Sequence, residues 1–61
     1  MNKTQQEKLV SHLLSRLEQG YTCKVFVQQD TESHDVACVA SGASVYTVFE
    51  NGNEFINGEK Q

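Results

Sequence analysis

The hydrophobic pattern of the chain changes its period once, at Gly20, and this change constrains the fold more than any other feature. The apolar residues ahead of it recur at helical spacing and form one stripe: Leu9, Val10, Leu13, Leu14 and Leu17. Beyond it, apolar and polar residues alternate in "YTCKVFVQQ", "HDVACVAS" and "ASVYTVFE", which is typical of half-buried strands. The pattern therefore predicts one amphipathic helix followed by a sheet.

The limits of the helix follow from capping signals. Thr4-Gln5-Gln6-Glu7 has the spacing of a capping box, in which Thr4 is the N-cap and the Glu7 side chain returns to its backbone. Gly20 can adopt the left-handed conformation that often follows the last turn of a helix. We therefore expect a helix over residues 5–19.

Short polar connections divide the rest of the chain into strands. The predicted strands cover residues 21–29, 34–41, 43–50 and 53–57. The Asn51-Gly52 pair favours a two-residue type I′ hairpin, because both positions need positive φ. Residues 58–61 are expected to fray. The prediction is a single α+β domain, residues 1–61, with one N-terminal helix packed on a three- to four-stranded antiparallel meander.

The lengths of the turns decide which side chains share a face, because a slip of one residue exchanges the two faces of a strand. We assume a four-residue loop at 30–33 and two-residue turns near Gly42 and at Asn51-Gly52. The core face then contains Cys23, Val25, Val27, Val36, Cys38, Ala40, Val45, Thr47, Phe49 and Ile56. The leucine stripe of the helix is expected to cover this face.

The opposite face of the predicted sheet has a polar rim and an apolar centre. The residues of that centre are Phe26, Val39, Tyr46, Val48 and Phe55. No second helix is available to cover it, and monomeric proteins rarely leave a large contiguous apolar patch in water. We therefore predict an association surface, and its simplest form is a sheet-to-sheet homodimer, since a two-fold interface uses the same patch twice.

A chain of 61 residues has a thin core, and such domains often use a disulfide, a metal or a partner subunit. Cys23 and Cys38 are predicted to share one face of neighbouring strands, and a four-residue loop at 29–32 would set them opposite each other. A disulfide is therefore conceivable, but buried reduced thiols are the preferred interpretation. These cysteines and the two histidines, His12 and His34, lack the spacing of structural zinc sites. No metal or cofactor is expected.

Neither catalysis nor nucleic-acid binding is the favoured interpretation. Ser11, His12 and Ser15 are helical neighbours on a solvated side, and so short a chain is not expected to enclose a catalytic pocket. The net charge of −3 weighs against attraction to phosphate. A positive line at Lys8, His12 and Arg16 is a secondary candidate for contact with phosphate or an acidic partner.

A helix followed by three antiparallel strands also resembles the first part of double-stranded RNA-binding domains. That family continues into a second helix with a lysine-rich start, for which the ending "NGEKQ" offers no counterpart. None of its RNA-binding residues can be carried over.

These observations lead to a hypothesis about function. No apolar run approaches the roughly 18 residues of a membrane span, and "MNKTQQEK" lacks the apolar region of a signal peptide, so we expect a cytoplasmic protein with no membrane contact. The favoured function is a non-enzymatic module that binds itself or another protein, such as an accessory or inhibitor protein of a phage or mobile element. The alternative is a regulator that binds or mimics nucleic acid.

Overall fold

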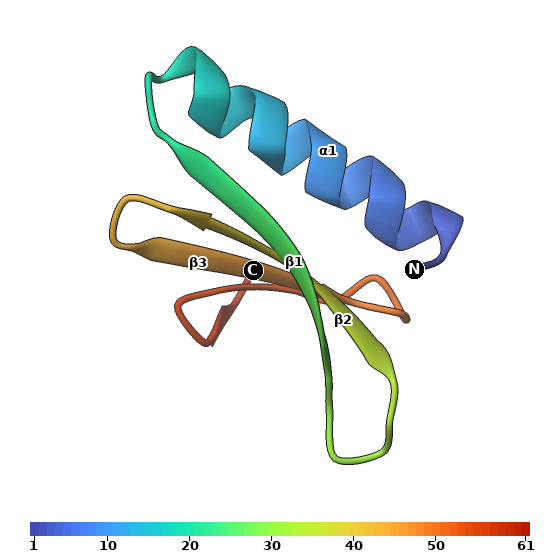
Figure 1. The fold of residues 1–61 in the computed structure, drawn as a ribbon. Helices are drawn as coiled ribbons and strands as arrows, with labels where there is room; N and C mark the ends of the chain where they lie inside the picture. Colours follow the sequence, from blue (N-terminus) through green and yellow to red (C-terminus); the bar gives the residue numbers. More distant parts are fainter.

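The computed structural model describes residues 1–61 and consists of one helix packed on one face of a five-stranded antiparallel sheet (Figure 1). The elements are α1 (Lys3–Glu18), β1 (Cys23–Gln29), β2 (Asp35–Ser41), β3 (Ser44–Phe49), β4 (Glu54–Ile56) and β5 (Glu59–Lys60). The strands lie in sequence order, so the sheet is a meander and the α+β prediction is confirmed. Of residues 58–61, which were expected to fray, Glu59 and Lys60 form β5. No helix of the protein is long and apolar enough to cross a membrane.

α1 begins two residues earlier than the sequence pattern predicts. The N-cap is Asn2, whose side-chain oxygen accepts from the Gln5 N–H at 2.9 Å, while Gln5 Oε1 accepts from the Asn2 N–H at 3.0 Å. This reciprocal pair is a capping box in the frame Asn-x-x-Gln, so the assignment of Thr4 as the N-cap is wrong. The helix ends as predicted, with Gly20 at φ 91° directly after the cap.

Two loops are one residue longer than assumed. The first joins Gln29 to Asp35 and is stabilised by Asp30, whose Oδ1 accepts from the N–H groups of Glu32 and His34, both at 2.9 Å. The second has three residues instead of two, because Phe49 pairs with Asn53 and the Gly52 N–H donates to the Phe49 carbonyl at 2.9 Å. The predicted two-residue Asn51-Gly52 turn is therefore wrong.

These longer loops exchange the faces of β1 and β4 relative to β2 and β3. The face beneath α1 contains Cys23, Val25, Val27, Ala37, Val39, Tyr46, Val48 and Ile56. The opposite, open face contains Phe26, Val36, Cys38, Ala40, Val45, Thr47, Phe49 and Phe55. The helix thus covers the face that was predicted to be bare. Cys23 and Cys38 lie on opposite faces as free thiols, so the shared face that made a disulfide conceivable is also wrong.

The open face is filled by its own aromatic side chains. Val36 and Cys38 are only 6% and 1% exposed, although no helix covers them. Phe26 lies directly across from Cys38, and Phe49 lies across from Val36. The Phe49 and Phe55 rings meet edge to face with centroids 5.3 Å apart. Large rings on the neighbouring strands β1 and β3 therefore shield the smaller side chains of β2.

Candidate interaction surface

Three of the five residues predicted to form an association surface are buried beneath α1. Val39, Tyr46 and Val48 are 0%, 3% and 0% exposed and belong to the same cluster as Leu9. Phe26 and Phe55 do lie on the open face, where both are partly buried. The predicted surface is wrong in this form, because the longer loops moved Phe26 and Phe55 to the face opposite the other three.

The predicted basic edge of α1 faces the sheet. Lys8 Nζ donates to the Gly52 carbonyl at 2.8 Å, and Arg16 Nε donates to Ser41 Oγ at 2.9 Å. The Arg16 guanidinium also lies 3.8 Å from the centre of the Tyr21 ring. His12 stacks on Tyr46, with ring centroids 4.1 Å apart and planes 10° apart. These side chains fasten the helix to the rest of the protein.

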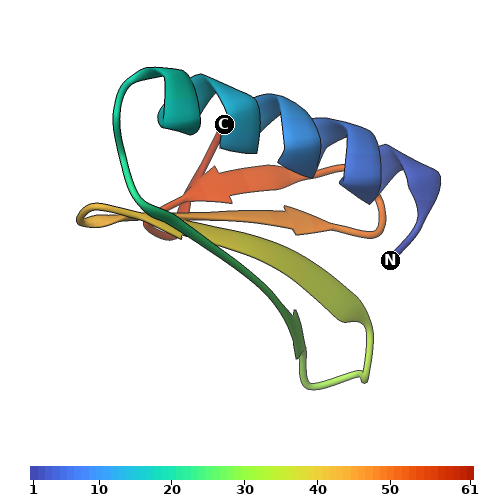
Figure 2. The same ribbon diagram turned by 45° about the horizontal axis from the view of Figure 1, so that its top comes forward.

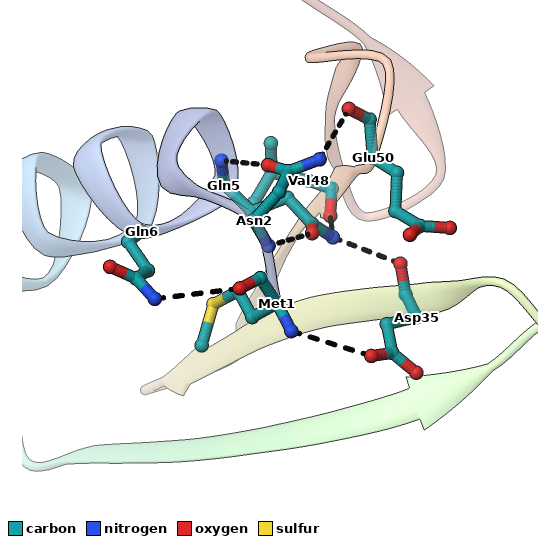
Figure 3. Close-up of polar contacts among 7 residues, drawn as sticks. All are labelled: Met1, Asn2, Gln5, Gln6, Asp35, Val48 and Glu50. Carbon is teal, nitrogen blue, oxygen red and sulfur yellow. Dashed lines mark hydrogen bonds and ion pairs between the residues drawn. The ribbon is translucent and has the colours of Figure 1, made fainter.

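Gln5 is a second polar anchor, and the sequence analysis missed it. Its side chain is 0% exposed, and its Nε2 donates to the carbonyls of Asp35 at 2.9 Å and Val48 at 3.1 Å. Asn2 joins the same network by donating from Nδ2 to the Glu50 carbonyl at 2.9 Å (Figure 3). The signal that could have revealed this anchor is the Asn-x-x-Gln spacing ahead of the leucine stripe.

The polar anchors set the rotation of the helix about its axis. In this rotation only part of the leucine stripe faces the sheet. Leu9 is 5% exposed and Leu13 packs against the core, as the stripe predicts. The remaining members of the stripe are about half exposed: Val10 47%, Leu14 54% and Leu17 49%. The expectation that the whole stripe covers the sheet is therefore only partly fulfilled.

Val10 and Leu17 lie on the side of α1 that faces the β1 edge, and Leu14 lies next to them on the outer side of the helix. Lys8, His12 and Ser15 line a cleft shared with β4, so at 3.6 residues per turn Val10 and Leu17 point to the opposite side. The helix-side residues of β1 are also exposed, Val25 at 45% and Val27 at 50%, since the β1–β2 hairpin bends away from the helix (Figure 2). We call Val10, Leu14, Leu17, Val25 and Val27 the α1–β1 flank.

The two edges of the sheet differ in how they are protected. β5 has two residues, whereas β1 has seven, "CKVFVQQ", with no proline, no glycine and a single charge at Lys24. Exposed edges are usually blunted by short strands, charges, proline or bulges, because their free N–H and C=O groups can pair with another chain. β1 has little of this protection and lies beside an exposed apolar flank.

The cleft on the other side of α1 is polar and has a volume of about 450 Å³. At its base the Tyr46 hydroxyl donates to Glu54 Oε1 at 2.6 Å, and burial, followed by this bond, raises the pKa of Tyr46 far above its ordinary value. Burial first, and the Arg16 charge second, lower the pKa of His12, whose Nε2 is buried without a hydrogen-bond partner. A neutral His12 is therefore favoured.

The chemistry of the cleft is limited by how these groups are paired. No hydrogen bond joins His12 to a serine hydroxyl, and Ser15 Oγ instead accepts from the Gln19 side chain at 3.3 Å. An activated nucleophile requires such a link to a base. No group of three or more His, Cys, Asp or Glu side chains is placed to hold a metal ion. The α1–β1 flank is therefore the stronger candidate site.

Comparison of the chain with protein-family models, with curated proteins and with solved structures finds no match. The function has to be inferred from the surface itself.

Proposed function

We propose that the protein is a non-enzymatic interaction module whose α1–β1 flank docks onto a second polypeptide chain. The observation that carries this proposal is the exposure of five aliphatic side chains, from 45% for Val25 to 54% for Leu14, beside an unprotected strand edge. Where exposed apolar side chains gather at one place on a surface, they typically mark a protein interaction site. The surface offers apolar side chains for packing and a backbone edge for pairing.

The expected mode of binding is addition of a strand to β1. In such complexes backbone hydrogen bonds supply affinity, and alternate side chains of the edge strand contact the incoming chain. Here those side chains are Val25 and Val27, and the exposed stripe of α1 lies on the same side of the sheet. Full burial of an aliphatic side chain contributes about 1.5–3 kcal/mol, so covering five half-exposed ones would contribute roughly 5 kcal/mol. That is close to the whole stability of a small domain.

A protein partner suits this surface better than nucleic acid does. The α1–β1 flank has no charged side chain, and Lys8 and Arg16 are engaged in contacts within the protein. Binding to phosphates needs free, clustered cations. We further propose a cytoplasmic setting, in which the free thiols of Cys23 and Cys38 stay reduced, and an accessory or inhibitor role of the kind suggested above.

The test compares two double variants as bait in extracts of the native host that also contain a differently tagged second copy of the chain. Leu14→Glu with Leu17→Glu places charges on the flank, and Ser11→Glu with Ser15→Glu places the same charges on the cleft side of α1. We expect the flank variant to lose the chains that the wild-type protein retains, while the control keeps them. Circular dichroism checks that both variants fold. Equal recovery with a folded flank variant would overturn the proposal.

A further inference from the structure

We infer that the chain that docks on the α1–β1 flank is a second copy of this protein, with the two β1 strands paired antiparallel about Phe26. This inference rests on the proposed function of the flank and adds the identity of its partner. It follows from the backbone groups, the symmetry and the side chains of β1.

The backbone of β1 offers a regular row of free groups. The Asp30 N–H donates to the His34 carbonyl at 3.0 Å, so this pair is of the hydrogen-bonded type. Because antiparallel pairs alternate between bonded and non-bonded types, Lys24, Phe26 and Gln28 bond to β2. The outward-pointing groups therefore belong to the intervening residues, Cys23, Val25, Val27 and Gln29. Each of them offers one N–H and one C=O to the open edge.

A two-fold axis at Phe26 would pair every one of these backbone N–H and C=O groups with a group of the partner copy. Phe26 is the central residue of the seven-residue strand, so an antiparallel copy centred there pairs the full length of β1. Val25 then lies across from the partner's Val27, and Cys23 lies across from the partner's Gln29. Each of the four outward-pointing residues then lies across from an outward-pointing residue of the partner. The two residues of each pair can exchange two backbone N–H to C=O hydrogen bonds. A shift by two residues in either direction pairs only residues 23–27 or 25–29.

The side chains also fit this register. On the helix side Val25 packs against the partner's Val27, and the bare stripes of the two helices extend the apolar contact. On the open side the two Phe26 rings meet at a non-bonded pair, where side chains approach most closely. Lys24 lies across from the partner's Gln28, so no like charges face each other. β-Strand pairs that combine β-branched and aromatic contacts in this way are the stabilising ones.

Self-pairing would also compensate for a thin core. Only nine of the 61 residues are buried, and two of those nine are the polar Gln5 and Ser41. Domains of this size commonly need an additional source of stability. A dimer supplies it without a disulfide or a metal, by covering Val25, Val27 and Phe26 at one edge.

The first part of the experiment measures the state of the full chain. Sedimentation equilibrium of the wild-type protein at micromolar concentration is expected to give twice the monomer mass. Val27→Glu, at the edge, is expected to raise the dissociation constant at least tenfold, about 1.4 kcal/mol. Val45→Glu, on the open face, is expected to leave it unchanged. Amide exchange should show that protection of the Val25 and Val27 N–H groups increases with protein concentration.

The second part tests the position of the axis. In a background with Cys23→Ser and Cys38→Ala, Phe26→Cys should form a disulfide between copies under mild oxidation, since non-bonded pairs bring Cα atoms to about 4.5 Å. Gln28→Cys is the matched control. It should not form this disulfide, because the two copies of residue 28 lie far apart, on opposite sides of the axis. A dimer that crosslinks equally through both, or leaves the Val25 amide unprotected, would overturn the register.

The outcomes separate the two proposals. A monomeric wild-type protein whose flank variant still loses a host partner would overturn the second-copy inference and leave the proposed function intact. A monomer with no flank-dependent partner would overturn both.

Discussion

The two long sides of α1 differ in kind: one is held by directional polar contacts, and the other is apolar and bare. On the cleft side Lys8 reaches the Gly52 carbonyl and His12 stacks on Tyr46. On the β1 side Val10 and Leu17 are 47% and 49% exposed. We infer from this difference that hydrogen bonds, and not the leucine stripe, set the rotation of this helix.

The free energies of these contacts explain why the helix keeps its polar contacts and does not bury Val10 and Leu17. Turning α1 to bury Val10 and Leu17 would break the hydrogen bonds from Gln5 to the Asp35 and Val48 carbonyls. Loss of the donor to the Asp35 carbonyl costs about 1–3 kcal/mol, and the Val48 carbonyl, which is also paired with Ala37 in the sheet, loses its second donor. Burying the exposed half of an aliphatic side chain returns only about 1 kcal/mol. The observed rotation keeps the hydrogen bonds and leaves the apolar side available for a partner.

The largest expected effect contrasts two leucines of the same stripe. Leu9→Ala should reduce the free energy of unfolding by about 3 kcal/mol, because Leu9 is 5% exposed and packs on the core. Leu14→Ala, at a position 54% exposed, should change it by less than about 0.5 kcal/mol. Urea denaturation at concentrations low enough to keep the chain monomeric measures both. Equal losses would mean that the two sides of the helix do not differ as described.

The next effect tests the polar anchor. Gln5→Leu should cost about 1–3 kcal/mol, since it keeps the volume but removes the side-chain donor to the Asp35 carbonyl and one of the two donors to the Val48 carbonyl, which is also paired with Ala37 in the sheet. The control is Gln6→Leu, because the Gln6 amide reaches only the Met1 carbonyl, at 3.4 Å on the surface. Urea denaturation should show little change for the control. A stabilised Gln5→Leu variant would show that the leucine stripe can orient the helix by itself.

Much of the fold could be predicted from local pattern, and the faces of the sheet could not. The change of period at Gly20 correctly separates the helix from the meander, and Ser41 pairs with Ser44 across the short turn at Gly42. The faces of β1 and β4 depended on single residues in two loops. Ser33 adopts φ 64° and Gly52 φ 89°, and only the glycine carries a sequence signal for such a conformation.

The site was harder to predict than the fold for a related reason. Both faces of the sheet are apolar, so composition could not decide which one the helix covers. Val25 and Val27 were assigned to the core face from the assumed length of the 30–33 loop, and they are exposed because β1 bends away from α1. Gln5 looks like any polar helix residue, and its role depends on carbonyls 30 and 43 residues away.

A smaller effect concerns the attachment of the last turn of α1. Arg16→Ala should cost about 1 kcal/mol, by removing the bond to Ser41 Oγ and the contact with the Tyr21 ring. Arg16→Lys should recover only part of this, because an ammonium lacks the planar guanidinium and the Nε donor. Thermal denaturation measures the differences. A full recovery with lysine would mean that charge alone holds this end of the helix.

The smallest expected effect is a change of stability with pH that arises only on the cleft side of α1. Burial, and then Arg16, lower the pKa of His12 in the folded protein below its ordinary 6.5, so the unfolded chain binds the proton more readily. The stability due to a neutral His12 is complete above about pH 6.5 and decreases as the pH falls below it. Urea midpoints at about pH 7.5 and about pH 5.5, on either side of the ordinary histidine pKa, should therefore differ less in His12→Gln than in the wild type.

The matched control for this pH effect is His34→Gln, which changes the exposed histidine of the β1–β2 loop and should keep the loss that His12 causes. The α1–β1 flank contains no titratable side chain, so the sides should respond differently. Acid should weaken the attachment of the helix while the dissociation constant of the proposed dimer stays the same over this range. If acid instead dissociates the dimer as strongly as it lowers the urea midpoint, the polar and apolar sides of α1 are energetically coupled, and the division between them fails.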